Sequence, residues 1–176
     1  MKTIILDGHD AVGKTTIGKK LVSQLKLEAL KAEWVEPYAI YNGEKLIDLY
    51  IKKDYEGIIK FTKERFYFIQ KKYSDNDILV FDRMWLTAIT LLPPSLRMEI
   101  PIIGHNILLW IDEKTTLERL TKRTNFDNAW EHKKYCDLYL ELANKYSIKV
   151  INTSINNIAS TIDNIMAGIK EQVLWK

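Results

Sequence analysis

A glycine-rich turn near the amino terminus carries a lysine and a threonine at a spacing that suits phosphate chemistry. Residues 3 to 16 read TIILDGHDAVGKTT, so four residues separate Gly8 from Gly13, Lys14 and Thr15. Glycines let a turn point its backbone N–H groups at an anion, and a helix that begins after the turn adds the positive end of its dipole. The lysine can reach the outer phosphate oxygens, and the threonine hydroxyl is a ligand for Mg²⁺. This spacing predicts a phosphate cradle.

The cradle needs a buried strand before it and a helix after it, in the pattern G-x-x-x-x-G-K-[ST]. An apolar run precedes Gly8, and apolar residues recur at helical spacing from Ile17 to Leu25. This context favours nucleotide binding over a plain strand-to-helix turn. The ligands we expect are ATP and Mg²⁺, and the residues predicted to bind them are Gly8, Ala11, Val12, Gly13, Lys14, Thr15 and Thr16.

The elements that must position the cradle are short apolar runs that alternate with helical patterns. The runs at 3–7, 77–82, 106–111 and 148–152 read as buried strands, and 32–37 is a weaker fifth. Parallel strands need crossover connections, which helices supply. We therefore expect an α/β fold of three layers, a P-loop NTPase fold with a five-stranded parallel sheet flanked by helices. No repeat or linker divides the chain, so residues 1–176 are expected to form one domain.

Composition bounds the class of protein. The chain has 176 residues, 26 basic against 23 acidic, so its net charge is +3 and it lacks the dense basic block of a nucleic-acid binder. Cys136 is the only cysteine, which excludes an internal disulfide and fits a reducing compartment. No apolar stretch is long enough for a signal peptide or a membrane span. We expect a cytoplasmic enzyme that acts on a small nucleotide.

A second charged motif follows the strand at 77–82. Asp82 ends this strand and Arg83 follows at once, so the carboxylate can orient Mg²⁺ while the guanidinium grips a second phosphate. The alternatives are that Asp82 caps the next helix and that Arg83 is a surface charge. The stretch LLWIDE at 108–113 resembles the acidic strand end of a motor ATPase and competes with this motif. A GTP-binding switch is disfavoured, because NKYS at 144–147 lacks the aspartate that reads guanine.

With these motifs the chain resembles the thymidylate kinase family of nucleoside monophosphate kinases. DGHDAVGKTT is similar to the family's E-G-x-D-G-A-G-K-T-T and keeps its aspartate as Asp10, with Asp7 for the glutamate and Ala11 for a glycine. DRMWLT is similar to D-R-Y-x-x-S, with Thr87 for the serine. Glu36 ends a stretch that looks like the family's R-E-P strand.

Further stretches extend the resemblance over nearly the whole chain. Phe61 and Arg65 match an F-x-x-x-R helix, whose aromatic packs on the acceptor base and whose arginine faces the acceptor phosphate. LLWIDEKTTLERLTKR resembles the strand and helix that lead into a lid, here near 119–131, with Arg119 and Arg123 as its arginines. Under this reading Asp112 ends the fourth strand. The family's longer base-reading helical stretch is absent here, and its members often form homodimers, so a homodimer stays open.

The resemblance implies a mechanism in which cations supply most of the catalysis. Lys14, Arg83, Arg119 and Arg123 would neutralise the transferred phosphoryl group, and Asp10 would orient the acceptor sugar. Glu36, Phe61, Arg65, Arg83 and Thr87 would line the acceptor site, and Thr15 and Asp82 would hold Mg²⁺. His9 is expected to lie on the loop surface without a catalytic role. The alternatives are a deoxynucleoside kinase with Glu36 as general base, a kinase of a nucleic-acid hydroxyl, and a non-enzymatic nucleotide-binding module.

Overall fold

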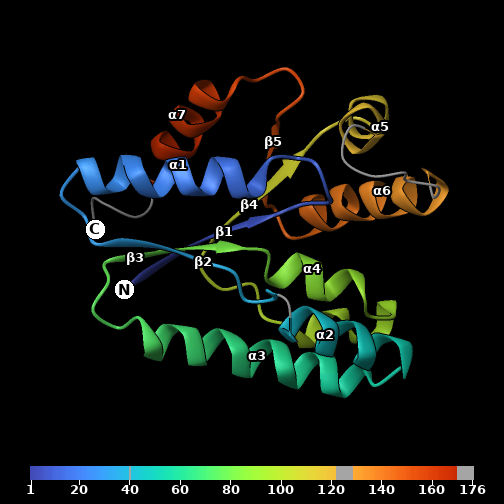
Figure 1. Cartoon of the computed structure of the whole chain (residues 1–176). Coiled ribbons are helices and arrows are strands. Elements are labelled where there is room, and N and C mark those ends of the chain that lie inside the picture. Colours follow the sequence, from blue (N-terminus) through green and yellow to red (C-terminus); the bar gives the residue numbers. More distant parts are fainter. Residues whose placement is uncertain (40, 122–128, 170–176) are drawn as a thin grey trace.

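A sheet of five parallel strands forms the centre of the molecule (Figure 1). A computed structural model of the chain describes residues 1–39, 41–121 and 129–169. The strands are β1 (Lys2–Asp7), β2 (Ala32–Val35), β3 (Ile78–Asp82), β4 (His105–Trp110) and β5 (Lys149–Asn152). Each falls within one of the apolar runs or within a residue of it, so the sequence prediction of the sheet is confirmed.

Helices cover both faces of this sheet and make the predicted three layers (Figure 1). One face carries α1 (Lys14–Leu27) and α7 (Ile158–Ile169). The opposite face carries α2 (Tyr41–Ile51), α3 (Tyr55–Lys72), α4 (Trp85–Thr90) and α6 (Ala129–Lys145). A 3-10 helix η1 (Pro94–Glu99) follows α4, and α5 (Glu113–Thr121) follows β4. This α/β architecture is consistent with a P-loop kinase fold.

The strands are apolar runs because both of their faces are buried. Along β1, Ile4 and Leu6 belong to the core under α1 and α7, whereas Ile5 belongs to the core on the opposite face. All three side chains have no exposed surface. A strand that is buried on both sides lacks the polar alternation of a half-exposed strand, which explains why continuous apolar runs predicted it correctly.

The strand order places β1 between the two halves of the sheet. The chain adds β2 and β3 on one side of β1 and then adds β4 and β5 on the other side. The order is β2-β3-β1-β4-β5, so β1 is central and its neighbours are β3 and β4. In open parallel sheets, ligands bind beyond the carboxyl ends of the strands at such a switch point. The register pairs Leu6 of β1 with Asp82 of β3, which brings the glycine loop (residues 8–16) next to Asp82 and Arg83.

Two local features differ from the sequence expectations. The helix α2 was not predicted, because its apolar residues are interrupted by Gly43 and by charged residues. β4 ends at Trp110, so Asp112 lies beyond the strand and caps α5, where its Oδ1 accepts from Thr115 N at 2.8 Å. Of the expected lid near 119–131, residues up to 121 belong to α5 and residues from 129 belong to α6, while 122–128 lie outside the described residues.

Glycine 18 lets α1 pack closely against β2. A Cβ added at Gly18 would collide with three ring atoms of Trp34. Alanine at this position gains about 1 kcal/mol of helix propensity but overpacks the interface, which costs about 1–3 kcal/mol. We expect Gly18→Ala to lower the free energy of unfolding in urea by roughly 1 kcal/mol. Ser23→Ala, an exposed change on the same helix, should be neutral or stabilising, and a more stable Gly18→Ala variant would contradict this packing.

Within the described part of the chain, every helix is too short or too polar to cross a bilayer.

Candidate functional site

The carbonyl groups at the start of the glycine loop are held by two cationic side chains. Lys14 Nζ donates to Gly8 O at 2.9 Å and to His9 O at 2.7 Å. Arg83 Nη1 also donates to Gly8 O, at 3.0 Å. A Cβ at Gly8 would collide with the Leu109 carbonyl, so no larger residue fits this approach of the loop to β4.

The second half of the loop is fixed from the other side. Arg119 Nη1 donates to Ala11 O at 3.0 Å, and Thr153 Oγ1 donates to Val12 O at 2.8 Å. Arg119 Nη2 also donates to Thr153 O at 3.0 Å, which joins the two supports. A loop that turns its carbonyl oxygens to fixed donors turns its amide N–H groups the other way, which is the arrangement that an anion needs.

Histidine 9 is buried, and the expectation that it lies on the loop surface is wrong. Its side chain is 3% exposed, with Nδ1 2.8 Å from Asp10 O and Nε2 3.4 Å from Ile111 O. The ring therefore ties the loop to the segment after β4. The sequence carried no signal for this contact, because it joins residues 102 positions apart.

The first helix begins without a capping side chain. Gly13 is its N-cap, has φ of 93°, and no side chain of the described residues caps it. The first turn also contains no acidic residue. The backbone N–H groups at the start of a helix have no partner within the helix, so this end suits a phosphate group.

Threonine 15, at the start of α1, meets Asp82 at the end of β3. Thr15 Oγ1 donates to Asp82 Oδ2 at 2.9 Å, and no hydrogen-bond partner of the buried Asp82 Oδ1 is found among the residues that the structure describes. Burial raises the pKa of Asp82 above its ordinary value, and the negative charge of Glu36 adds to this rise. A buried carboxylate oxygen with a hydroxyl beside it fits a hard cation such as Mg²⁺, which would complete its shell with phosphate and water oxygens.

Burial also shifts the charge equilibrium of Lys14. Burial, with a smaller contribution from the nearby Arg83, lowers the pKa of this ammonium group to about 7, although Asp82 and other carboxylates partly oppose the shift. The unfolded chain therefore keeps the Lys14 proton between pH about 7 and about 10.4, where the folded protein without ligand has released it. Below pH 7 the folded protein buries a charged Lys14, which lowers the free energy of unfolding. This destabilisation decreases as the pH rises above 7, because the folded protein then holds Lys14 in its neutral form.

This shift predicts a pH-dependent effect of replacing Lys14. The melting temperature of Lys14→Met minus that of wild type should be largest near pH 6. This difference should decrease as the pH rises toward about 9. Thermal unfolding in the absence of nucleotide measures the difference at each pH. Lys19→Ala, an exposed lysine change on the same helix, should show no such trend. A difference that is constant across this range would contradict the buried charge.

Arginine 83 is held in an uncommon backbone conformation beside the loop. Its φ is 67°, in the left-handed region that favours glycine, and its N–H donates to Leu6 O at 3.0 Å. Its Nη2 forms an ion pair with Asp10 Oδ1. The strained backbone aims the guanidinium across the loop instead of leaving it as a surface charge, and such strain is concentrated at functional sites.

The helix α4 is capped by Asp7 of β1, which sequence reasoning did not foresee. Asp7 is 1% exposed, and its carboxylate accepts from the backbone N–H groups of Met84, Leu86 and Thr87, each at 3.1 Å. Thr87 Oγ1 donates to Asp7 Oδ1 at 2.7 Å and lies 2.9 Å from Tyr139 Oη. The threonine hydroxyl therefore links α4 to β1 and to α6.

Three of the residues expected on the acceptor side, Glu36, Phe61 and Arg65, lie in or beside the segment that follows β2. Phe61 is 9% exposed, and its ring centroid lies 6.4 Å from that of Tyr38. Arg65 Nε donates to Pro37 O at 3.1 Å, so both α3 side chains face the segment that follows β2. Glu36 is exposed at the end of this strand.

Two cavities share the walls of the glycine loop. One of about 210 Å³ is lined by Asp10, Ala11, Gly13, Lys14, Thr15, Thr16, Asp82 and Arg83. The other is larger, about 590 Å³, and lies between the loop, Arg119 and the start of α7. Its other lining residues include Val12, Ile17, Thr153, Asn156 and Asn157. The structure thus brings the predicted cradle, Asp82, Arg83 and Arg119 together, while Arg123 lies outside the described residues.

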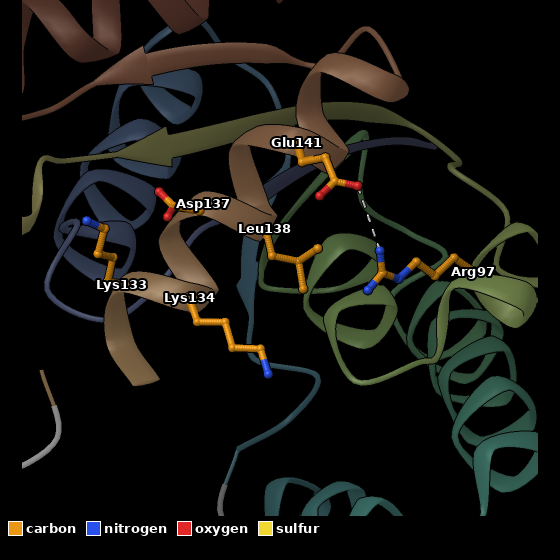
Figure 2. Close-up of a pocket in the computed structure, with 6 residues that line it drawn as sticks. All are labelled: Arg97, Lys133, Lys134, Asp137, Leu138 and Glu141. Atoms are coloured by element: carbon orange, nitrogen blue, oxygen red, sulfur yellow. Dashed lines mark ion pairs between the residues drawn. The ribbon is translucent and has the colours of Figure 1, made fainter. Parts of the chain in front are cut away.

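A further cavity between η1 and α6 does not reach the glycine loop. It measures about 460 Å³, and Figure 2 shows its six lining residues. Arg97 points across it toward Glu141 of α6, with Nη1 3.9 Å from Oε1 (Figure 2). Lys133 and Lys134 diverge from each other, and Lys133 pairs with Glu113 at 3.9 Å. Its charges are thus partly paired within the protein, and it shares no residue with the two loop cavities.

Comparison with known proteins gives one informative similarity. The chain is 26% identical over 169 residues to a protein of Metallosphaera sedula named probable thymidylate kinase. The alignment covers 88% of this chain and 86% of that protein. No protein-family model matches the chain. The parallel fold and this similarity together support a nucleotide kinase.

Proposed function

We propose that the protein transfers the γ-phosphoryl group of ATP to a nucleoside monophosphate, in the manner of a thymidylate kinase. The observation that carries the proposal is the hydrogen bond from Thr15 to Asp82, which lies beside the buried ammonium group of Lys14. Three features at the carboxyl ends of the strands suit a triphosphate. They are a loop whose carbonyl groups are hydrogen-bonded, a helix start without a capping side chain, and a carboxylate that can bind a cation. The similarity to a probable thymidylate kinase supports the same class of acceptor.

The two loop cavities supply seats for the donor nucleotide. The smaller cavity would take the phosphates, because Lys14, Thr15 and Arg83 line it. The larger cavity would take the adenosine, with Arg119 as one wall. Since both Arg119 Nη atoms are bound to backbone carbonyls, we assign Arg119 to loop support and base binding, not to a moving lid.

Phosphoryl transfer at this site needs positioning and charge, not a strong base. An oxygen of the acceptor phosphate attacks the γ-phosphorus, the bond to the β,γ-bridging oxygen breaks, and ADP leaves. Lys14 neutralises the transferred oxygens, and Arg83 holds the acceptor phosphate with help from Arg65. Asp10 orients the acceptor sugar. Mg²⁺ held by Thr15 and Asp82 would supply further charge neutralisation.

A second candidate function is a deoxynucleoside kinase. The observation that favours it is Glu36, an exposed carboxylate near enough to Asp82 to raise its pKa. A sugar hydroxyl, unlike a phosphate, needs a general base, and Glu36 would be the carboxylate that supplies it. In that case Glu36→Gln would lose activity, whereas a monophosphate kinase would tolerate the change.

An acceptor screen separates the two functions. ADP release from Mg-ATP should be measured with nucleosides and with nucleoside monophosphates as acceptors, using wild type and Glu36→Gln. We expect turnover with monophosphates in both proteins. Turnover that occurs only with nucleosides and is lost in Glu36→Gln would establish the second function, and release with neither acceptor class would refute both.

A further inference from the structure

The larger loop cavity, of about 590 Å³, has one charged side chain among its described lining residues, that of Arg119. Both Nη atoms of Arg119 donate to backbone carbonyls, and the Thr153 hydroxyl donates to Val12 O. These two side chains therefore hold the glycine loop. Two consecutive carboxamides, Asn156 and Asn157, also line the cavity and can form hydrogen bonds with a base inside it.

Asparagine 156 has an amide group whose orientation is fixed by one hydrogen bond. Its Nδ2 donates to Asn152 O at 2.7 Å, and the residue is half-buried. A backbone carbonyl can only accept, so the amide nitrogen, and not the amide oxygen, must face Asn152. The atom that Asn156 can offer to a ligand is therefore Oδ1, which is an acceptor.

Asparagine 157 has its amide group in the opposite orientation. It directly precedes α7, and its Oδ1 accepts from Ser160 N at 2.8 Å, as the side chain of a helix cap does. A backbone N–H can only donate, so here the amide oxygen must face the helix. The atom left for a ligand is Nδ2, which is a donor. Neighbouring residues of one cavity wall thus offer one acceptor and one donor.

A further polar group of this cavity has no partner within the described part of the chain. Thr161 lines the cavity and has no exposed surface, and no hydrogen bond of its Oγ1 is found among the residues that the structure describes. It lies one helical turn beyond Asn157, on the same side of α7. Buried hydroxyl groups are normally hydrogen-bonded, so a polar ligand or a water molecule in the cavity would complete this one.

We propose that Asn156 and Asn157 recognise the base of the phosphoryl donor and select adenine over guanine. This inference rests on the kinase function proposed above, with the donor base in the larger loop cavity. Adenine has a donor, its N6 amino group, beside acceptor ring nitrogens. The amino group donates to Asn156 Oδ1, and Asn157 Nδ2 donates to a ring nitrogen. Guanine has the acceptor O6 in place of the amino group, so it would face Asn156 Oδ1 without a hydrogen between them.

Nucleotide affinity tests the inference separately from turnover. Calorimetry of the full chain with Mg-ATP and with Mg-GTP measures the two dissociation constants. We expect ATP to bind about 10-fold or more tightly than GTP, the discrimination that one good bidentate pair supplies. Equal affinities would overturn the inference and leave the kinase function intact. ATP binding without transfer to any acceptor would contradict the proposed function, and binding of neither nucleotide would refute both.

Replacing Asn157 by aspartate should change the preference. An aspartate keeps one oxygen for Ser160 N, so the cap of α7 is retained, but it replaces the amide donor by an acceptor. Two acceptors then match the N1–H and N2 amino donors of guanine. We expect the ratio of GTP to ATP dissociation constants to fall by about 10-fold or more in Asn157→Asp. The ratio cancels the general repulsion between the added charge and the phosphates, which both nucleotides share.

Two further variants complete the test. Asn164→Asp adds the same charge at an exposed position of α7 that does not line the cavity, and it should keep the wild-type ratio. Asn156→Ala removes the acceptor without touching the helix cap, so its ratio should approach one. An unchanged ratio in folded Asn157→Asp or in folded Asn156→Ala would overturn the inference.

Discussion

Replacing Lys14 by methionine is expected to lower kcat for phosphoryl transfer by about 10³-fold or more, with the fold retained. The buried ammonium is the only side chain found to bind both Gly8 O and His9 O among the described residues, and it lines the cavity proposed for the phosphates. Methionine keeps the length of the side chain but provides neither charge nor donor. ADP release under saturating acceptor and Mg-ATP measures the loss.

The control for this result is an exposed lysine on the same helix. Lys19→Ala should retain wild-type turnover, because Lys19 faces solvent on α1. Circular dichroism and thermal unfolding should show that Lys14→Met is folded. Wild-type turnover in a folded Lys14→Met variant would mean that the glycine loop is not the catalytic site, and the function proposed here would fall with it.

The sheet and the loop were predictable because their signals are local. Each strand is a continuous apolar run bounded by polar residues, and burial on both faces makes such a run distinctive. The spacing of Gly8, Gly13, Lys14 and Thr15 is equally local. The order of the strands was not predicted, and the pairing of Leu6 with Asp82, which brings Asp82 next to the loop, is known only from the structure.

Contacts between distant residues could not be predicted in the same way. Arg119 binds Ala11 O, 108 positions away, and this contact depends on the placement of β4 next to β1. The sequence pattern predicted Arg119 as a lid residue, and it could not show that this side chain binds the glycine loop. Asp7 was noted for replacing a glutamate, but its capping of α4 depends on how β3 and α4 meet in space.

Tyrosine 38 shows what a motif comparison leaves out. The Glu36-Pro37 pair drew attention as the end of a familiar strand, and Phe61 as a familiar aromatic. Neither pattern shows that the Tyr38 ring lies next to Phe61 in space, although the sequence shows a tyrosine directly after Pro37. The shape of an acceptor site depends on such volumes, so the class of reaction is easier to infer from sequence than the acceptor.

Removing the Arg83 guanidinium should produce the second large effect. Arg83→Ala is expected to lower kcat by about 10³-fold, as arginine fingers do, and to raise the KM of the acceptor more than that of ATP. The guanidinium bridges Gly8 O and Asp10, so its loss frees both the loop and the Asp10 carboxylate. Initial rates at varied acceptor and varied ATP separate the two constants.

The backbone of Arg83 allows catalysis and stability to be tested apart. Because φ is 67°, glycine accepts this conformation without the strain that alanine carries. Arg83→Gly should therefore be at least as stable as Arg83→Ala and equally inactive. Arg97→Ala removes another half-buried arginine, bound to Leu92 O away from the loop, and should keep wild-type turnover. Near-normal activity in Arg83→Gly would show that the acceptor phosphate is held by other groups.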